Sequence, residues 1–113
     1  MNIGIVGGRL RHDFDYIEKQ LDMFVRPKDI IISGGAAGVD SYAHTYAVDH
    51  KLSYLVKHPI ERTAEAFKAR NIEIVAEADV ILAFPAKGSR GTWHTVNAAL
   101  KQGKRVVVYT EVV

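Results

Sequence analysis

Residues 80–103 read VILAFPAKGSRGTWHTVNAALKQG. The continuous apolar run Val80–Phe84 predicts a fully buried strand, and residues 93–102 predict a helix that ends at Gly103. The connecting residues 87–92 contain two glycines, two hydroxyl groups and two cations. Glycine allows backbone N–H groups to approach a ligand closely, and a helix N-terminus carries a partial positive charge. The segment is therefore typical of a site for a phosphate or another anion.

The same succession of apolar strand, polar turn and helix repeats along the chain. Strands are expected at residues 2–6, 29–32, 52–56, 79–84 and 105–109, and helices at residues 13–24, 39–50, 61–78 and 93–102. Continuous apolar strands separated by helices indicate a parallel sheet covered on both faces. We therefore predict one α/β domain over residues 1–113. Its doubly wound, Rossmann-like, five-stranded parallel sheet has the order 3-2-1-4-5, with helices on both faces.

Two further expectations concern which side chains face the core. Small residues let the second helix lie close to the sheet, at Ala43 and Ala47. The inward face of the long third helix is expected to carry Ala66, Ala69, Ile72 and Val75 or Ala76. Trp93 is expected in the core rather than on a ligand-stacking wall.

Composition narrows the class of protein. The 113 residues are 48% hydrophobic and 25% charged, which is ordinary for a globular domain. The chain has no apolar run that could span a bilayer, no signal-peptide pattern and no cysteine. We therefore expect a cytoplasmic protein with no membrane partner, disulfide framework or thiolate metal site. The net charge of +2 is too small to indicate a nucleic-acid partner by itself.

Familiar catalytic and cofactor motifs are missing. The Gly7-Gly8-Arg9 turn is not a GxGxxG fingerprint, and the chain has neither a GKS/GKT P-loop nor a GxSxG elbow. The five histidines show no HxH or HExxH spacing. We therefore predict no metal and no cofactor.

In a doubly wound sheet, the ligand crevice lies at the carboxyl ends of the strands where the winding reverses, here strands one and four. The loops after these strands, together with the loop at residues 33–38, should therefore lie side by side. The candidate ligand- or phosphate-binding residues are Gly7, Gly8, Arg9, Ser33, Gly34, Gly35, Asp40, Arg70, Asn71, Lys87, Gly88, Ser89, Arg90, Gly91 and Thr92.

Several of these side chains have an ordinary alternative role. Arg9 is either an anion clamp or a solvated cation. Asp40 either complements the dipole of its helix or accepts a hydrogen bond from a ribose or a base. Thr92 could simply be an N-cap. Asn71 is the less ordinary case, because asparagine competes for backbone hydrogen bonds inside a helix, and this hints at a polar role.

The chain resembles the SLOG superfamily, named for the Smf/DprA and LOG proteins. Residues 33–40, SGGAAGVD, followed by Ala43-His44, are similar to the SGxAxGxD…AH motif of the DprA/Smf proteins. Arg70-Asn71 matches their RN dipeptide, and residues 83–92 are similar to the strand-then-GT motif of LOG proteins. The whole set is most similar to the small stand-alone SLOG proteins. The resemblance implies a nucleotide-type crevice and a homo-oligomer, a dimer or larger.

LOG proteins are phosphoribohydrolases that release the base from nucleoside 5′-monophosphates. The resemblance places Arg70 at their arginine position, but no glutamate follows Gly91-Thr92, and the loop reads PAKGSRGT instead of PGGxGT. Asp40 is the only motif acid that could replace the glutamate. The candidate catalytic residues are therefore Arg70 and Asp40, and any such activity is expected to be weak.

Three functions remain open. The first is binding of a small nucleotide-type ligand, either to sense or sequester it or to hydrolyse its N-glycosidic bond slowly. The alternative is DprA-like binding of single-stranded DNA, which the 33–44 match favours. The small size, weak net charge and lack of an evident aromatic-plus-basic platform count against this alternative. The third is a scaffold whose crevice is vestigial.

Overall fold

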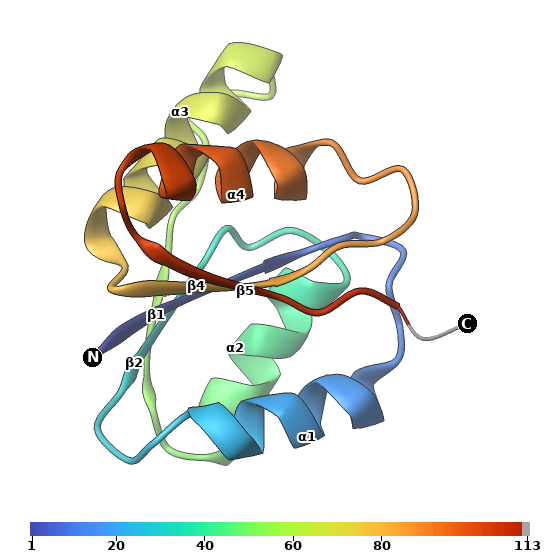
Figure 1. The fold of residues 1–113 in the computed structure, drawn as a ribbon, viewed down its shortest axis with the longest axis vertical. Coiled ribbons are helices and arrows are strands. Elements are labelled where there is room, and N and C mark those ends of the chain that lie inside the picture. The colour runs from blue at the N-terminus through green and yellow to red at the C-terminus, as the bar shows by residue number, and fades with distance from the viewer. Residues whose placement is uncertain (112–113) are drawn as a thin grey trace.

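The computed structural model describes residues 1–111, and its centre is a parallel sheet (Figure 1). The five strands are β1 (Asn2–Gly7), β2 (Ile30–Ser33), β3 (Ser53–Val56), β4 (Val80–Phe84) and β5 (Arg105–Val108). They lie in the order β3-β2-β1-β4-β5, and every neighbouring pair is parallel. The predicted Rossmann-like architecture and strand order are thus confirmed.

The helices cover both faces of this sheet. Helices α1 (Phe14–Phe24) and α2 (Val39–Asp49) lie on one face, and α3 (Ala64–Glu77) and α4 (Gly91–Lys101) on the other (Figure 1). Alternate side chains of each strand supply the two cores, because successive residues point to opposite faces. Within residues 1–111, no helix is both long enough and apolar enough to cross a membrane.

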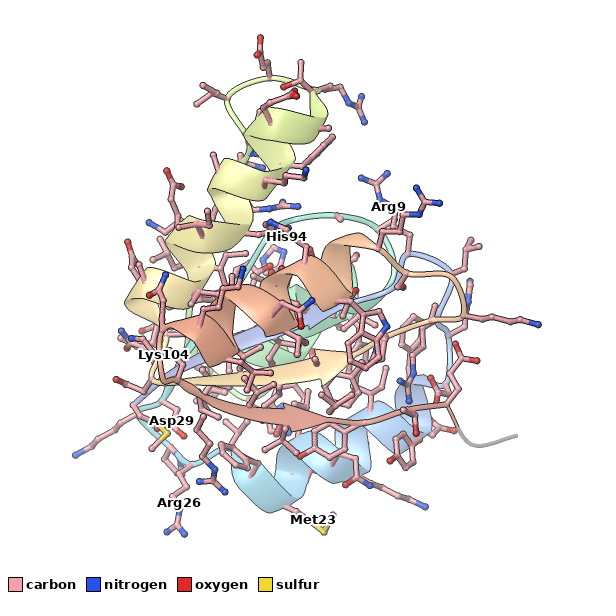
Figure 2. All side chains as sticks on the ribbon, turned by 45° about the horizontal axis from the view of Figure 1, so that its top comes forward. Arg9, Met23, Arg26, Asp29, His94 and Lys104 are labelled. Carbon is pink, nitrogen blue, oxygen red and sulfur yellow. The ribbon has the colours of Figure 1, made fainter. Side chains whose placement is uncertain are left out.

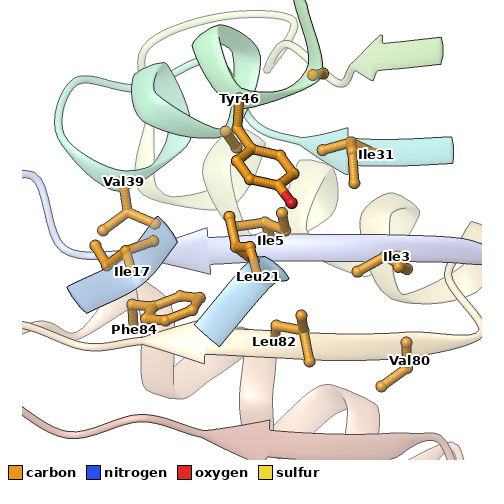
Figure 3. Close-up of a cluster of buried hydrophobic side chains, with 12 residues drawn as sticks. Ile3, Ile5, Ile17, Leu21, Ile31, Val39, Tyr46, Val80, Leu82 and Phe84 are labelled. Atoms are coloured by element: carbon orange, nitrogen blue, oxygen red, sulfur yellow. The ribbon is translucent and has the colours of Figure 1, made fainter. Parts of the chain in front are cut away.

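The strand β4 illustrates this division. Val80, Leu82 and Phe84 pack under α1 and α2 with Ile17, Leu21 and Val39 (Figure 3). Ile81 and Ala83 point the other way and pack against Ile74, Val75, Val96 and Ala99 of α3 and α4. All five strand residues are buried, as the apolar run at 80–84 predicts.

The expected inward face of α3 is correct at Ala66 and Val75 and wrong at Ala69 and Ile72, because the helix is rotated relative to the predicted face. In α3 the buried residues are Ala66, Asn71, Ile74 and Val75, while Ala69, Ile72 and Ala76 face solvent. The pair Ile74-Val75 packs with Ala78 on the sheet, and this turn of the helix carries the polar Asn71 inward. The predicted small residues Ala43 and Ala47 of α2 are both buried, as expected.

Trp93 is also misplaced by the sequence argument. It is 41% exposed and lines neither cavity of the described part of the chain. Helix α4 begins at Gly91, two residues earlier than predicted, and its inward stripe is Thr92, Thr95, Val96 and Ala99. Trp93 therefore falls on the outer side of the first turn.

Three loops pack backbone against backbone at the carboxyl edge of the sheet. Gly7 pairs with Phe84 across the sheet, and the N–H of Gly8 donates to the carbonyl of Phe84 at 3.1 Å. A Cβ on Gly38 would lie 2.5 Å from the carbonyl oxygen of Gly8. The predicted meeting of the loops after β1, β2 and β4 is therefore confirmed, and only residues without a side chain allow so close an approach.

A buried arginine holds the ends of three strands together beneath these loops. Arg11 is 1% exposed, and its guanidinium forms a bidentate pair with Asp13 at 2.8 and 3.1 Å. It also donates to the carbonyls of Pro85, Tyr109 and Thr110, which follow β4 and β5. Its charge is thus fully paired and hydrogen-bonded, which burial of an arginine requires.

The close approach at Gly38 predicts a difference between two glycines that both have a positive φ. Gly38 has φ +75° and Gly88 has φ +78°, but the described residues leave the space beside Gly88 open. Both alanine variants meet the strain of a positive φ, and Gly38, with ψ −124°, also lies outside the left-handed helical region that other residues sometimes adopt. Gly38→Ala should lose a further 1–3 kcal/mol or so, because its Cβ collides with backbone atoms. Urea unfolding of the two variants measures the difference, and equal losses would contradict the packing argument.

Candidate functional site

A cavity of about 690 Å³ opens at the carboxyl ends of β1 and β4. The loops after these strands, the start of α2 and the facing sides of α3 and α4 form its wall. Its volume is in the range of sites for nucleotide-sized ligands. The predicted site residues that line it are Gly7, Gly8, Arg9, Asp40, Arg70, Asn71, Lys87, Gly88, Ser89, Arg90, Gly91 and Thr92.

A second cavity of about 410 Å³ adjoins the first. The two share Arg9, Ala36, Phe67 and Arg70 in their walls, and Gly34 and Gly35 belong to the second. Among the described residues, Ser33 is the one predicted site residue that lines neither cavity.

Ser33 instead belongs to a polar contact under the second loop. It is fully buried, and its hydroxyl is 2.5 Å from the hydroxyl of Tyr54. The ring of Tyr54 stacks on His44 at 4.5 Å, and its hydroxyl donates to the carbonyl of Asp40 at 3.4 Å. The structure therefore places Ser33, Tyr54 and His44 behind the start of α2, where they support Asp40.

The larger cavity has a buried floor and a charged rim. The floor consists of the buried residues Val6, Asp40, Asn71, Ile74, Thr92 and Thr95. The rim carries four exposed cations, Arg9, Lys68, Lys87 and Arg90. Positive charge thus surrounds the entrance while the single floor carboxylate lies inside.

Asp40 is the most perturbed group of the floor. It is 6% exposed, and its Oδ2 accepts a hydrogen bond from the N–H of Ala36 at 3.2 Å. Its Oδ1 has no hydrogen-bond partner within residues 1–111. Burial raises the pKa of Asp40 to about 6, against the opposing effects of the Ala36 and Gly34 N–H groups and of Arg70 and Arg9.

Arg70 is held in place by its neighbours. It donates from Nη1 to the carbonyl of Gly34 at 2.7 Å and from Nε to Oδ1 of Asn71 at 2.9 Å. Partial burial lowers the pKa of Arg70, while Asp40 raises it. The buried Asn71, the unusual residue in the sequence of this helix, thus has the polar role of orienting the arginine.

The loop after β4 leaves the groups that were predicted to bind an anion open. Ser89 Oγ accepts from the N–H of Ala86 at 3.0 Å, which closes the turn. Arg90 occupies the N-cap position of α4, so Thr92 is not the cap, and no described side chain caps this helix end. The space beside Gly88 and Gly91 is also open in the part of the chain that the structure describes.

The structure adds residues that the sequence argument missed. Phe67 lies between the two cavities, and the guanidinium carbon of Arg70 is 5.7 Å from the centre of its ring. Arg62 and His58 line the smaller cavity, and His94 the larger one. Phe67 could have been predicted from the sequence. It is three positions before Arg70 and four before Asn71, and residues at these spacings lie on the same face of a helix.

Comparison with known proteins gives a match to one family model and to solved structures with a similar fold. Residues 1–57 match the family model described as DNA recombination-mediator protein A. DNA processing protein A from Streptococcus pneumoniae has TM-score 0.85 and 18% identity, over 99% of this chain and 51% of that chain. No curated protein sequence matches the chain.

A second solved structure is DNA processing protein A from Helicobacter pylori, described for its single-stranded DNA binding mode. It has TM-score 0.76 and 20% identity, over 100% of this chain and 66% of that chain. At these identities the likeness shows the shared fold. The chain spans about half the length of one relative and just under two thirds of the other.

The raised pKa of Asp40 predicts a pH-dependent loss of stability. An acid that is harder to ionise in the folded state destabilises it as pH rises from the unfolded pKa of 3.8 to the folded pKa of about 6. A pKa shift of this size lowers the unfolding free energy by about 3 kcal/mol at most. The Asp40→Asn variant has no carboxyl group at this position and should not show this loss. As pH rises from about 4 to about 7, its unfolding free energy should therefore increase by about 3 kcal/mol relative to that of the unmodified protein. Urea unfolding across this range measures the difference, and parallel pH profiles would refute it.

Proposed function

The chain belongs to the family of DNA recombination-mediator protein A, and from this premise we propose that its crevice binds single-stranded DNA. Phosphates of the strand lie on the exposed cations of the rim, and a base contacts Phe67. The family match and the described DNA binding of the Helicobacter pylori relative support this function.

The observation that carries the proposal is the placement of Phe67 among cations. Proteins that bind single strands combine a positively charged groove with aromatic side chains on which bases stack. Here two adjoining cavities share Phe67, and their walls carry Arg9, Arg62, Lys68, Arg70, Lys87 and Arg90. Two neighbouring cavities also suit a ligand longer than one nucleotide.

The distribution of charge favours the same surface. The net charge is only +2, but exposed acids such as Glu18, Asp22 and Asp49 lie on α1 and α2, which cover the other face of the sheet. Exposed acids also lie on α3, but the four rim cations give the mouth of the larger cavity a positive local potential, and local potential governs the approach of a polyanion.

A free nucleotide is the second candidate ligand. The 690 Å³ cavity, with Arg70 and the buried Asp40 in its wall, favours it. Such a protein would sense or sequester the nucleotide, or hydrolyse its N-glycosidic bond slowly. A homo-oligomer remains a prediction. Val112 and Val113, which could contribute to a contact between copies, lie outside the described residues, and Tyr46, a second candidate for that contact, is 3% exposed and packs in the core.

Neutralising a rim cation should weaken DNA binding in a salt-dependent way. Arg9→Gln removes one phosphate contact, so the affinity for a mixed-sequence single strand should fall several-fold. The slope of log K against log salt should shrink by about 0.7. Arg26→Gln is the matched control, because Arg26 is exposed on the far side of the sheet from Arg9 (Figure 2). Fluorescence anisotropy at several salt concentrations measures both variants; equal effects of the two substitutions would count against the crevice.

Hydrolysis of nucleoside 5′-monophosphates should be slow or absent. An oxocarbenium-like transition state needs a nearby carboxylate, and none follows Gly91-Thr92. Chromatography of released base measures the activity of the unmodified protein and of Arg70→Ala. Robust turnover that Arg70→Ala abolishes would favour the nucleotide function and make Asp40 the leading candidate to replace the missing glutamate.

A further inference from the structure

The outer edge of β5 has no neighbouring strand within residues 1–111. The strand pairs with β4 on its inner side, and in Figure 1 it lies between α4 and α1. The N–H of Tyr109 donates to the carbonyl of Ala83 at 2.8 Å, which sets the alternation of the ladder. Because successive residues of a strand direct their backbone groups to opposite sides, the N–H and C=O groups of Val106 and Val108 point away from β4. These groups are open to a further strand.

The side chains of β5 are unusual for a free edge. Natural sheets generally protect such an edge with charged residues, proline or a bulge. Residues 106–109 read VVVY, a run of β-branched and aromatic residues without a charge, a glycine or a proline. Residues of this kind have the highest preference for a sheet. The edge therefore favours pairing with another strand.

Helix α4 adds an apolar stripe above this edge. Trp93 and Leu100 are 41% and 59% exposed, and their spacing of seven residues puts them on one side of the helix. His94 and Thr95 lie on the other flank, in the wall of the cavity between α3 and α4. Since α4 packs on β4 and β5 while α3 packs on β1, the flank away from α3 is the one above the free edge of β5.

We propose that β5 and α4 form the interface of a twofold dimer, in which the β5 strands of two copies of this chain pair antiparallel with Val107 on the axis. The outward backbone groups of Val106 then bond to those of Val108 in the second copy, and the reverse. Arg105 lies opposite Tyr109 of the second copy, so no like charges meet there. The inference goes beyond the proposed function and does not rest on it.

The spacing of the elements favours a second copy over an unrelated strand. Neighbouring strands lie about 4.8 Å apart, and α4 lies over β4 and β5, so this pairing sets the two α4 helices two strand spacings apart. The resulting separation of about 10 Å is that of packed helices. Val96, midway along the apolar stripe, packs with Val106 and Val108. The axis through the middle of β5 therefore brings Trp93 of one copy beside Leu100 of the other, and the stripe covers itself.

The dimer fixes where its two crevices lie. Antiparallel pairing points the carboxyl ends of the two sheets in opposite directions, and each crevice lies at the carboxyl ends of β1 and β4. The two crevices therefore face away from each other, and each is built from the residues of one copy. Dimer formation accordingly needs no ligand, so a failure of DNA binding leaves this inference standing.

Sedimentation equilibrium over a range of concentrations tests the interface. The unmodified chain should show a reversible monomer–dimer equilibrium. Leu100→Lys places a charge against an indole ring and should raise the dissociation constant by about tenfold or more. Val108→Pro should do the same, because it removes an outward N–H but no bond to β4, and an edge strand tolerates such a proline. Val48→Lys is the matched control and should change nothing, since Val48 is 63% exposed on α2, which packs on β1, β2 and β3.

A single introduced cysteine tests the register, because the chain has none of its own. Val107→Cys should crosslink two copies under mild oxidation, since directly opposite residues of a non-hydrogen-bonded pair have Cα atoms about 4.5 Å apart. Val48→Cys should stay monomeric in the same gel. Equal crosslinking of the two variants would overturn the proposed register.

The remaining outcomes decide the interface as a whole. A monomer at every concentration would overturn it, and so would a dimer that Leu100→Lys leaves intact. Urea unfolding checks that each variant is folded. If Val108→Pro does not fold, Leu100→Lys decides alone, because Leu100 is largely exposed within one copy.

Discussion

The close passage of three backbones beyond the end of β1 is the constraint on which the rest of the structure depends. Gly8 lies between the loop that carries Gly38 and the loop that follows β4. A side chain at Gly8 or at Gly38 would collide with atoms of a neighbouring loop. The buried Arg11 fixes the same corner from below through the carbonyls after β4 and β5. These contacts bring the first turns of α2 and α4 to one opening, and the cavity is the space they enclose.

The buried carboxyl group on the floor of the cavity, away from the exposed cations of the rim, lowers the stability of the folded state. Asp40 is buried with one unpaired oxygen, and the half-buried Arg70 is tied to Gly34 and Asn71. A core built for stability alone would place apolar groups at such positions, because unpaired burial is unfavourable. Sites with perturbed ionisable groups in a cleft are more often functional than structural. The arrangement therefore supports the proposal of a ligand-binding crevice over a vestigial one.

Strand order and loop adjacency could be predicted from the sequence, because a parallel sheet needs apolar strands, and apolar runs such as Val80–Phe84 are visible without any contact information. The side chains of α3 could not be assigned in this way. Its phase follows from how Ile74 and Val75 fit the sheet, and that fit carries Asn71 inward and Ile72 outward against the apolar pattern. Arg11 escaped notice for a related reason, since its partners are carbonyl groups from distant strands.

The outward position of Trp93 has a practical consequence. It is the single tryptophan of the chain, it is 41% exposed, and it lies in the first turn of α4 between Thr92 and His94, both of which line the cavity. Indole emission responds to changes in polarity and quenching around the ring. The protein thus carries an intrinsic fluorophore at the helix end that forms one wall of the crevice, so a change in its emission when a ligand is added would report binding near this helix end in the unmodified chain without an attached dye.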